Sequence, residues 1–188
     1  MKTDTLYIKN MVCPRCIKAV KELFENLNYT LIDIKLGEVI VKADQINYDE
    51  IRQKLNDLGF ELLEDKKLQL IEKIKTAIID YIHYSDNLIR KTNLSDYLVE
   101  KTGKDYSYLS TLFSGIENIT IEKYLIKQKV EKVKELIVYD ELNINEIALR
   151  LNYSSSAHLS SQFKNETGLS PSMFKKLQNR DRKSLTDI

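Results

Sequence analysis

The chain has 188 residues, of which 43% are hydrophobic, enough for one large or two small domains with buried cores. No apolar run approaches the ~20 residues that a membrane-spanning helix needs, and the N-terminus lacks the pattern of a signal peptide. We therefore expect a cytoplasmic protein without a membrane partner. Its two cysteines, Cys13 and Cys16, are too close together to cross-link a fold, and a reducing compartment would keep them as thiols.

The net charge of +1 is unevenly distributed along the chain. Residues 1–65 contain nine Lys and Arg against twelve Asp and Glu, a net of −3, whereas residues 66–188 contain twenty against sixteen, a net of +4. This contrast indicates two modules and assigns any polyanionic partner to the second.

Hydrophobic periodicity in the first module predicts an α+β domain. The expected elements are, in chain order, a strand at 5–9, a helix at 16–27, strands at 32–36 and 39–41, a helix at 47–58 and a strand at 60–63. Strand, helix, strand, strand, helix, strand is the order of a ferredoxin-like βαββαβ domain, which we place at residues 1–66.

The segment Met11-Val12-Cys13-Pro14-Arg15-Cys16 falls between the first strand and the first helix. On this segment, and on Leu58-Gly59-Phe60 at its end, the module resembles heavy-metal-associated domains, which are built around Met-x-Cys-x-x-Cys. The resemblance covers about 60 residues and implies that Cys13 and Cys16 hold a metal ion. One departure is Asn10, where the family usually has Gly.

The chemistry of two neighbouring thiols at a helix N-terminus leads to the same expectation. The helix dipole lowers the pKa of such thiols, and soft thiolates favour Cu(I) or another soft ion, with Zn(II) as an alternative if other ligands join. Neither histidine is near in sequence, so a closed tetrahedral zinc site within one chain is not expected. Two alternatives stay open: a thiol-disulfide switch, and an interaction domain whose cysteines have no function. Met11 is expected to be a packing residue rather than a ligand.

The connector at residues 67–78 belongs to an amphipathic helix predicted over 66–83. Its apolar side carries Leu68, Ile71, Ile74, Ile78 and Ile82. Because no Pro/Gly/Ser-rich linker is present, we expect the modules to be joined by helix. This helix is either a stiff joint between the modules or simply the first core helix of the second module, and both can hold.

A repeat with an offset of 50 residues marks the second module, placed at 79–180 and followed by a basic tail at 181–188. The matching pairs are Leu109 and Leu159, Ser110 and Ser160, Phe113 and Phe163, Asn118 and Gly168, Thr120 and Ser170, and Tyr124 and Phe174. Ser95 and Asp105 are the expected helix caps in the first copy, and Asn143 and Ser155 those in the second. A long unbroken helix is predicted between the copies, from Ile121 to Tyr139.

On these features the second module resembles the AraC/XylS family, whose members carry two helix-turn-helix units. The resemblance covers about 100 residues, and the segments that carry it are Tyr108–Phe113, Tyr124-Leu125, Leu142–Ala148, Leu151–Ser155, His158–Lys164, Thr167–Pro171 and Phe174. The resemblance implies an all-α domain that binds double-stranded DNA and regulates transcription, and it allows a homodimer. Each unit would lay its second helix in a major groove, in two successive grooves on one face of the duplex.

Carried over position by position, the resemblance assigns two sets of DNA-binding residues. The base-facing candidates are Ser107, Ser110, Thr111, Ser156, Ala157, Ser160 and Ser161, and the phosphate contacts are Lys104, Lys164, Lys175 and Lys176. Family members often have Arg at the positions of Thr111 and Ser161, so hydroxyl, methyl or water-mediated contacts are expected here instead. Ser110 and Ser160 are expected on exposed helix faces, and Tyr108 and His158 in partly buried positions.

The apolar helix residues of the second module are expected in its core: Leu98, Leu109, Leu112, Phe113, Ala148, Leu159, Phe163 and Phe174. We find no constellation of acid, base and nucleophile beyond the two thiols, so the protein is not expected to be an enzyme. The strongest enzyme hypothesis is a thiol-disulfide oxidoreductase that uses Cys13 and Cys16. A metal chaperone with a protein-docking module is a third hypothesis.

Overall fold

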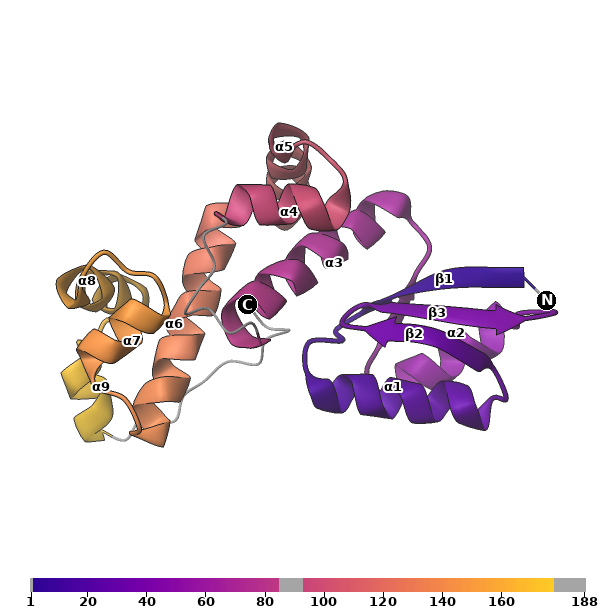
Figure 1. The fold of residues 1–188 in the computed structure, drawn as a ribbon, viewed down its shortest axis with the longest axis horizontal. Helices are drawn as coiled ribbons and strands as arrows, with labels where there is room; N and C mark the ends of the chain where they lie inside the picture. Colours follow the sequence, from indigo (N-terminus) through magenta and orange to yellow (C-terminus); the bar gives the residue numbers. More distant parts are fainter. Residues whose placement is uncertain (1, 85–92, 178–188) are drawn as a thin grey trace. The chain divides into compact units, whose positions relative to one another are not determined.

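The computed structural model describes residues 2–84 and 93–177 (Figure 1). The chain divides into two compact units, one of residues 1–77 with 98–104 and one of 78–97 with 105–188. The first contains a small antiparallel sheet and the second is helical, as the sequence predicts. The basic tail predicted at 181–188 lies outside the described residues. Within the described part of the chain, no helix is both long and apolar enough to cross a membrane.

The first unit contains the predicted elements in the predicted order. They are β1 (Lys2–Lys9), α1 (Pro14–Asn26), β2 (Thr30–Lys35), β3 (Glu38–Ala43), α2 (Tyr48–Asp57) and β4 (Glu61–Leu63). Every pair of neighbouring strands is antiparallel, in the order β2-β3-β1-β4. Leu6 lies opposite Val39 and Ile8 opposite Leu62, which aligns their apolar side chains on one face.

Helices α1 and α2 cover that face of the sheet (Figure 1). Leu6 and Ile8 of β1 pack there against Val20 and Phe24 of α1 and Leu55 of α2, and all five are buried. The alternation in β1 and the three- to four-residue spacing in α1 therefore meet in a single core. An irregularity between Leu31 and Asp33 interrupts the pairing of the edge strand β2.

Helix α3 (Lys66–Ile79) follows β4 and ends in a π-helical turn, η1 (Asp80–Tyr84). The expected apolar side is confirmed for Ile71, Ile74, Ile78 and Ile82, which are buried, but it is wrong for Leu68, which is 42% exposed. Leu68 lies in the first turn of α3, where Asp65 Oδ1 accepts its backbone N–H at 3.0 Å. The sequence predicted a continuous α-helix to residue 83 and did not indicate the π-helical turn.

The remaining helices confirm the 50-residue repeat. They are α4 (Leu94–Thr102), α5 (Tyr106–Glu117), α6 (Ile121–Tyr139), α7 (Ile144–Arg150), α8 (Ser156–Thr167) and α9 (Pro171–Leu177). Helices α4 and α7, α5 and α8, and α6 and α9 begin 50 positions apart, at 94 and 144, 106 and 156, and 121 and 171. Helix α6 has the predicted bounds and is unbroken, so it forms a rigid element between the two copies.

Equivalent packing contacts recur in the two copies. The rings of Phe113 and Tyr124 meet edge to face with centroids 5.6 Å apart, and those of Phe163 and Phe174 do the same at 5.6 Å. The core residues expected in this module are buried, with one exception: Leu112 is only partly buried. It lies one position before Phe113, so it borders the buried side of α5 rather than belonging to it.

The predicted helix caps hold in the second copy and differ in the first. Asn143 forms a capping box with Glu146, and the Ser155 side chain accepts a hydrogen bond from the backbone N–H of His158 at 3.1 Å. Asp105 precedes α5 but makes no side-chain capping bond. Ser95 is not a cap, because it lies inside α4.

Asn93 caps α4 instead. Its Oδ1 accepts the backbone N–H of Asp96 at 2.9 Å and the hydroxyl of Ser95 at 2.7 Å. A polar residue two positions earlier than predicted therefore satisfies the first turn of this helix.

Candidate functional site

Helices α5 and α8 are the second helices of the two repeated units, and they present the predicted base-facing residues. Ser107, Thr111, Ala157 and Ser161 are exposed. The surface that they form on each helix is small and uncharged: hydroxyl groups, a threonine methyl and an alanine methyl. Such side chains allow close approach to a base edge without the bidentate geometry of arginine.

Three other predicted base-facing residues are partly buried: Ser110, Ser156 and Ser160. The expectation that Ser110 and Ser160 lie on the exposed faces is therefore wrong. Each directly follows a fully buried leucine, Leu109 or Leu159, and lies about 100° from it around the helix axis. These two serines flank the buried side, and Thr111 and Ser161 lie nearer the centre of the exposed face.

Tyr108 and His158 occupy equivalent positions and are exposed, contrary to the expectation of partial burial. Tyr108 is 49% exposed. Each precedes a buried leucine, so helix geometry turns it toward the side of Ser107 and Thr111, or of Ala157 and Ser161. The position relative to Leu109 and Leu159 could have revealed this, whereas residue type suggested burial.

The ring of His158 is held in place by its neighbours. Its Nδ1 lies 3.0 Å from Ser154 Oγ, and the ring meets that of Tyr153 edge to face with centroids 5.4 Å apart. Tyr153 is itself anchored, because its hydroxyl donates to Gln162 Oε1 at 2.8 Å and Lys129 Nζ lies 4.8 Å from its ring centroid. Burial raises the pKa of Tyr153 to about 12 and lowers the pKa of Lys129.

The four lysines predicted to contact phosphates, Lys104, Lys164, Lys175 and Lys176, are all exposed. Lys175 forms an ion pair with Asp140. At the start of α9, the Ser170 hydroxyl accepts the backbone N–H of Met173 at 3.2 Å. Lys104 lies just before α5, whereas Lys164 lies in the last turn of α8 and Lys175 and Lys176 in the last turn of α9. Exposed lysine ammonium groups can bind phosphate oxygens wherever they reach the backbone of a duplex.

The second feature is the cysteine pair of the first unit. Cys13 occupies the N-cap position of α1 without a side-chain capping bond, and Pro14 is the first residue of that helix. The two sulfur atoms are 3.1 Å apart. Both cysteines are partly buried, and Met11 is fully buried, as expected of a packing residue. The structure thus brings the two thiols together at a helix N-terminus.

The two thiols differ in pKa. Burial acts to raise the pKa of Cys13, but hydrogen bonds from the Cys16 thiol and from backbone N–H groups, together with the charge of Arg15, lower it overall. Burial and the hydrogen bond with Cys13 raise the pKa of Cys16. Cys13 is therefore the more acidic thiol. Among the described residues, no group of three or more His, Cys, Asp or Glu side chains could hold a metal ion.

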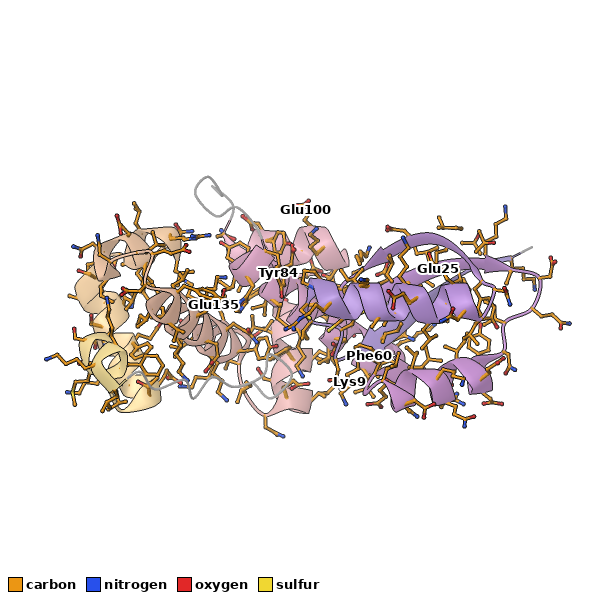
Figure 2. The ribbon with its side chains drawn as sticks, turned by 90° about the horizontal axis from the view of Figure 1, so that it is seen from below. Lys9, Glu25, Phe60, Tyr84, Glu100 and Glu135 are labelled. Atoms are coloured by element: carbon orange, nitrogen blue, oxygen red, sulfur yellow. The ribbon has the colours of Figure 1, made fainter. Side chains whose placement is uncertain are left out.

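Asn10 stands where the heavy-metal-associated domains that the first module resembles usually have glycine, and its backbone conformation is one that glycine favours. Its φ is +71°, in the left-handed region that Gly favours and that Asn tolerates better than most residues. Its side chain donates from Nδ2 to the carbonyl oxygen of Gly59 at 3.2 Å. The ion pair of Lys9 and Glu61, 2.9 Å long, and the buried Phe60 lie beside this bond, and Lys9 and Phe60 are labelled in Figure 2.

Comparison with known proteins shows which family the helical part resembles. Residues 98–177 match the family described as "Helix-turn-helix domain". This range contains α5 to α9 and most of α4, including both candidate DNA-facing helices. Over these residues the chain is similar to helix-turn-helix domains.

Two known proteins are similar to this part of the chain. The Msm operon regulatory protein of Streptococcus mutans serotype c (strain ATCC 700610 / UA159) is 28% identical over 119 residues, which cover 61% of this chain and 43% of that protein. The match thus spans less than half the length of this relative. The C-terminal domain of AraT, a response regulator from Geobacillus stearothermophilus, has the same fold, with a TM-score of 0.50 and 24% identity, covering 64% of this chain and 92% of that one.

Proposed function

We propose that the protein is a cytoplasmic, sequence-specific DNA-binding transcription regulator of the AraC type and not an enzyme. One observation carries this proposal: two equivalent helix-turn-helix units, 50 residues apart, are joined by the unbroken helix α6, and each exposes small uncharged side chains on its second helix. A rigid link between two such helices suits two successive major grooves on one face of a duplex.

In this proposal α5 and α8 read the bases and the exposed lysines bind phosphates. The Ser161 hydroxyl can donate to or accept from a base edge, whereas the Thr111 hydroxyl donates to the Ser107 carbonyl oxygen at 2.9 Å and can accept from a base. The methyl groups of Thr111 and Ala157 offer apolar contact to a thymine methyl. Lys104, Lys164, Lys175 and Lys176 supply the sequence-independent part of the affinity. Because neither helix exposes an arginine, we expect base discrimination to be spread over several weak contacts.

Selection of duplexes from a random-sequence pool by the full chain tests this function. We expect enrichment of sites with two half-sites whose centres are roughly one helical turn, ~10 base pairs, apart. Recovery of duplexes without any shared sequence would contradict sequence-specific regulation.

We further propose that the first unit is a ferredoxin-like, heavy-metal-associated domain whose Cys13 and Cys16 bind Cu(I) or another soft ion. The sheet order, the position of both thiols at the start of α1 and the lowered pKa of Cys13 support this assignment. Two thiolate ligands suit a soft monovalent ion, and Zn(II) would need ligands from outside this chain. Bound metal would serve as the signal that changes DNA affinity.

A thiol-disulfide switch is the second candidate for the same pair, favoured by the 3.1 Å distance between the sulfur atoms and by the difference in pKa. The Cys13 thiolate would attack one sulfur of a small-molecule disulfide and release a thiolate. Cys16 would then displace the second thiolate, so that the pair loses two electrons and two protons and the external disulfide becomes two thiols.

A further inference from the structure

Asn10 connects the cysteine pair to a helix outside the sheet. When the Cys13 thiol donates to Cys16 Sγ across their 3.1 Å contact, the single S–H of Cys16 donates to the Asn10 carbonyl oxygen at 3.9 Å. The backbone N–H of Asn10 donates to Oε1 of Glu72 at 3.2 Å. Glu72 belongs to α3. One peptide residue therefore touches a thiol on one side and a carboxylate of α3 on the other.

The burial of Glu72 calls for an explanation, because a buried carboxylate is costly and an apolar side chain of similar size would often pack as well. Glu72 is only 6% exposed. One turn later, Thr76 is also buried. Gly37, between β2 and β3, lies so near that a Cβ added to it would be 3.0 Å from the methyl carbon of Thr76. Helix α3 is thus held closely against the same end of the sheet as the cysteine loop, with a polar group at the contact.

Helix α3 leads without interruption into η1, which belongs to the second unit. There His83 Nε2 lies 3.1 Å from Gln128 Oε1 of α6, and Gln128 Nε2 donates to the Tyr124 hydroxyl at 3.1 Å. Gln128 is fully buried. The helix that contacts Asn10 therefore continues into a turn that is hydrogen-bonded to the helix joining the two helix-turn-helix units, and π-helical turns often occur at functional positions.

We propose that Asn10 and Glu72 form a relay through which the state of the Cys16 thiol alters helix α3. A soft metal ion and a disulfide both replace the hydrogen on Cys16 Sγ, so either change removes the donor to the Asn10 carbonyl. The peptide at Asn10 then shifts, and its N–H carries the change to Glu72. Glu72 is in this sense a positioning residue for the cysteine loop. The relay would be the route by which the proposed metal or redox signal leaves the cysteine pair, so its role in regulation rests on that proposed function.

The first arm of the test uses silver(I) as a soft, redox-inactive probe and the full chain. Amide hydrogen exchange of residues 66–79 is measured with and without one equivalent of the ion, in the wild type and in three variants. In the wild type we expect exchange in α3 to change about 5-fold. Glu72→Leu should still bind silver but lose this change, Glu72→Gln should retain most of it because the amide oxygen still accepts, and the exposed Glu22→Leu should behave as the wild type.

The second arm needs no metal and leaves Glu72 intact. Cys16→Ser keeps a hydroxyl donor and Cys16→Ala has none, so exchange in α3 should differ between these two variants by a similar factor. If silver fails to bind the wild type, the metal proposal fails and this arm alone decides the relay. The relay is overturned if the Ser and Ala variants exchange alike, or if silver binds and α3 responds equally in Glu72→Leu and the wild type.

Discussion

Thr111→Glu and Ser161→Glu are each expected to lower duplex affinity about 100-fold. Both side chains are exposed on the second helix of their helix-turn-helix unit, where a carboxylate would meet the negative potential of a DNA groove. Neither side chain is part of the core, so the melting temperature should change by less than about 4 °C. Affinity measured by fluorescence anisotropy and thermal unfolding followed by circular dichroism check the two parts.

Thr30→Glu is the matched control for charge, because Thr30 is exposed on β2 of the first unit. It should leave duplex affinity within a factor of two. Wild-type affinity in both Thr111→Glu and Ser161→Glu would show that α5 and α8 do not face the DNA. A loss of stability comparable to that of a core substitution would show instead that the helix faces are rotated relative to their assignment.

The Cys13→Ser, Cys16→Ser double variant should change metal binding from one soft ion per chain to none. Serine preserves the size of both side chains but replaces the soft thiolate with a hard oxygen that stays protonated. The sequence contains two cysteines in all, so the double variant has no thiolate left to take over the ion. Titration of the reduced protein with Cu(I) against a competing chelator gives the stoichiometry.

Met11→Leu is the control for this experiment, since Met11 is fully buried and is assigned to packing. Binding retained in Met11→Leu and lost in the double variant would locate the ion at the two cysteines. Unchanged stoichiometry in the double variant would remove the metal site. DNA affinity that stays the same with and without bound ion would remove the signal function while leaving the site.

Much of the fold could be predicted because local chemistry and tertiary packing agree. The bounds of α6 follow from a capping threonine at 120 and an uninterrupted periodic run to Tyr139, after which Asp140 adopts a left-handed conformation. The repeat is visible because equivalent caps and core rings recur at a fixed offset. The position of Cys13 and Cys16 between a strand and a helix could also be predicted, because apolar residues alternate before them and recur at helical spacing after them.

What the sequence did not reveal depends on contacts between distant residues or on angles around a helix. Glu72 accepts the backbone N–H of Asn10, 62 positions away, and nothing near Glu72 in sequence signals this contact. The exposure of His158 depends on its angle from Leu159, which residue type alone does not give. The π-helical turn after Ile79 likewise lies in a segment whose residue spacing predicts a regular α-helix.

The salt dependence of duplex binding by the full, reduced chain tests the central claim most directly. Phosphate contacts release counterions, so the logarithm of the association constant should fall linearly with the logarithm of salt concentration. Replacing both Lys164 and Lys176 with Gln should make that slope shallower by about two. Binding that is absent at low salt, or that does not weaken as salt rises, would contradict the assignment of this protein as a DNA-binding regulator.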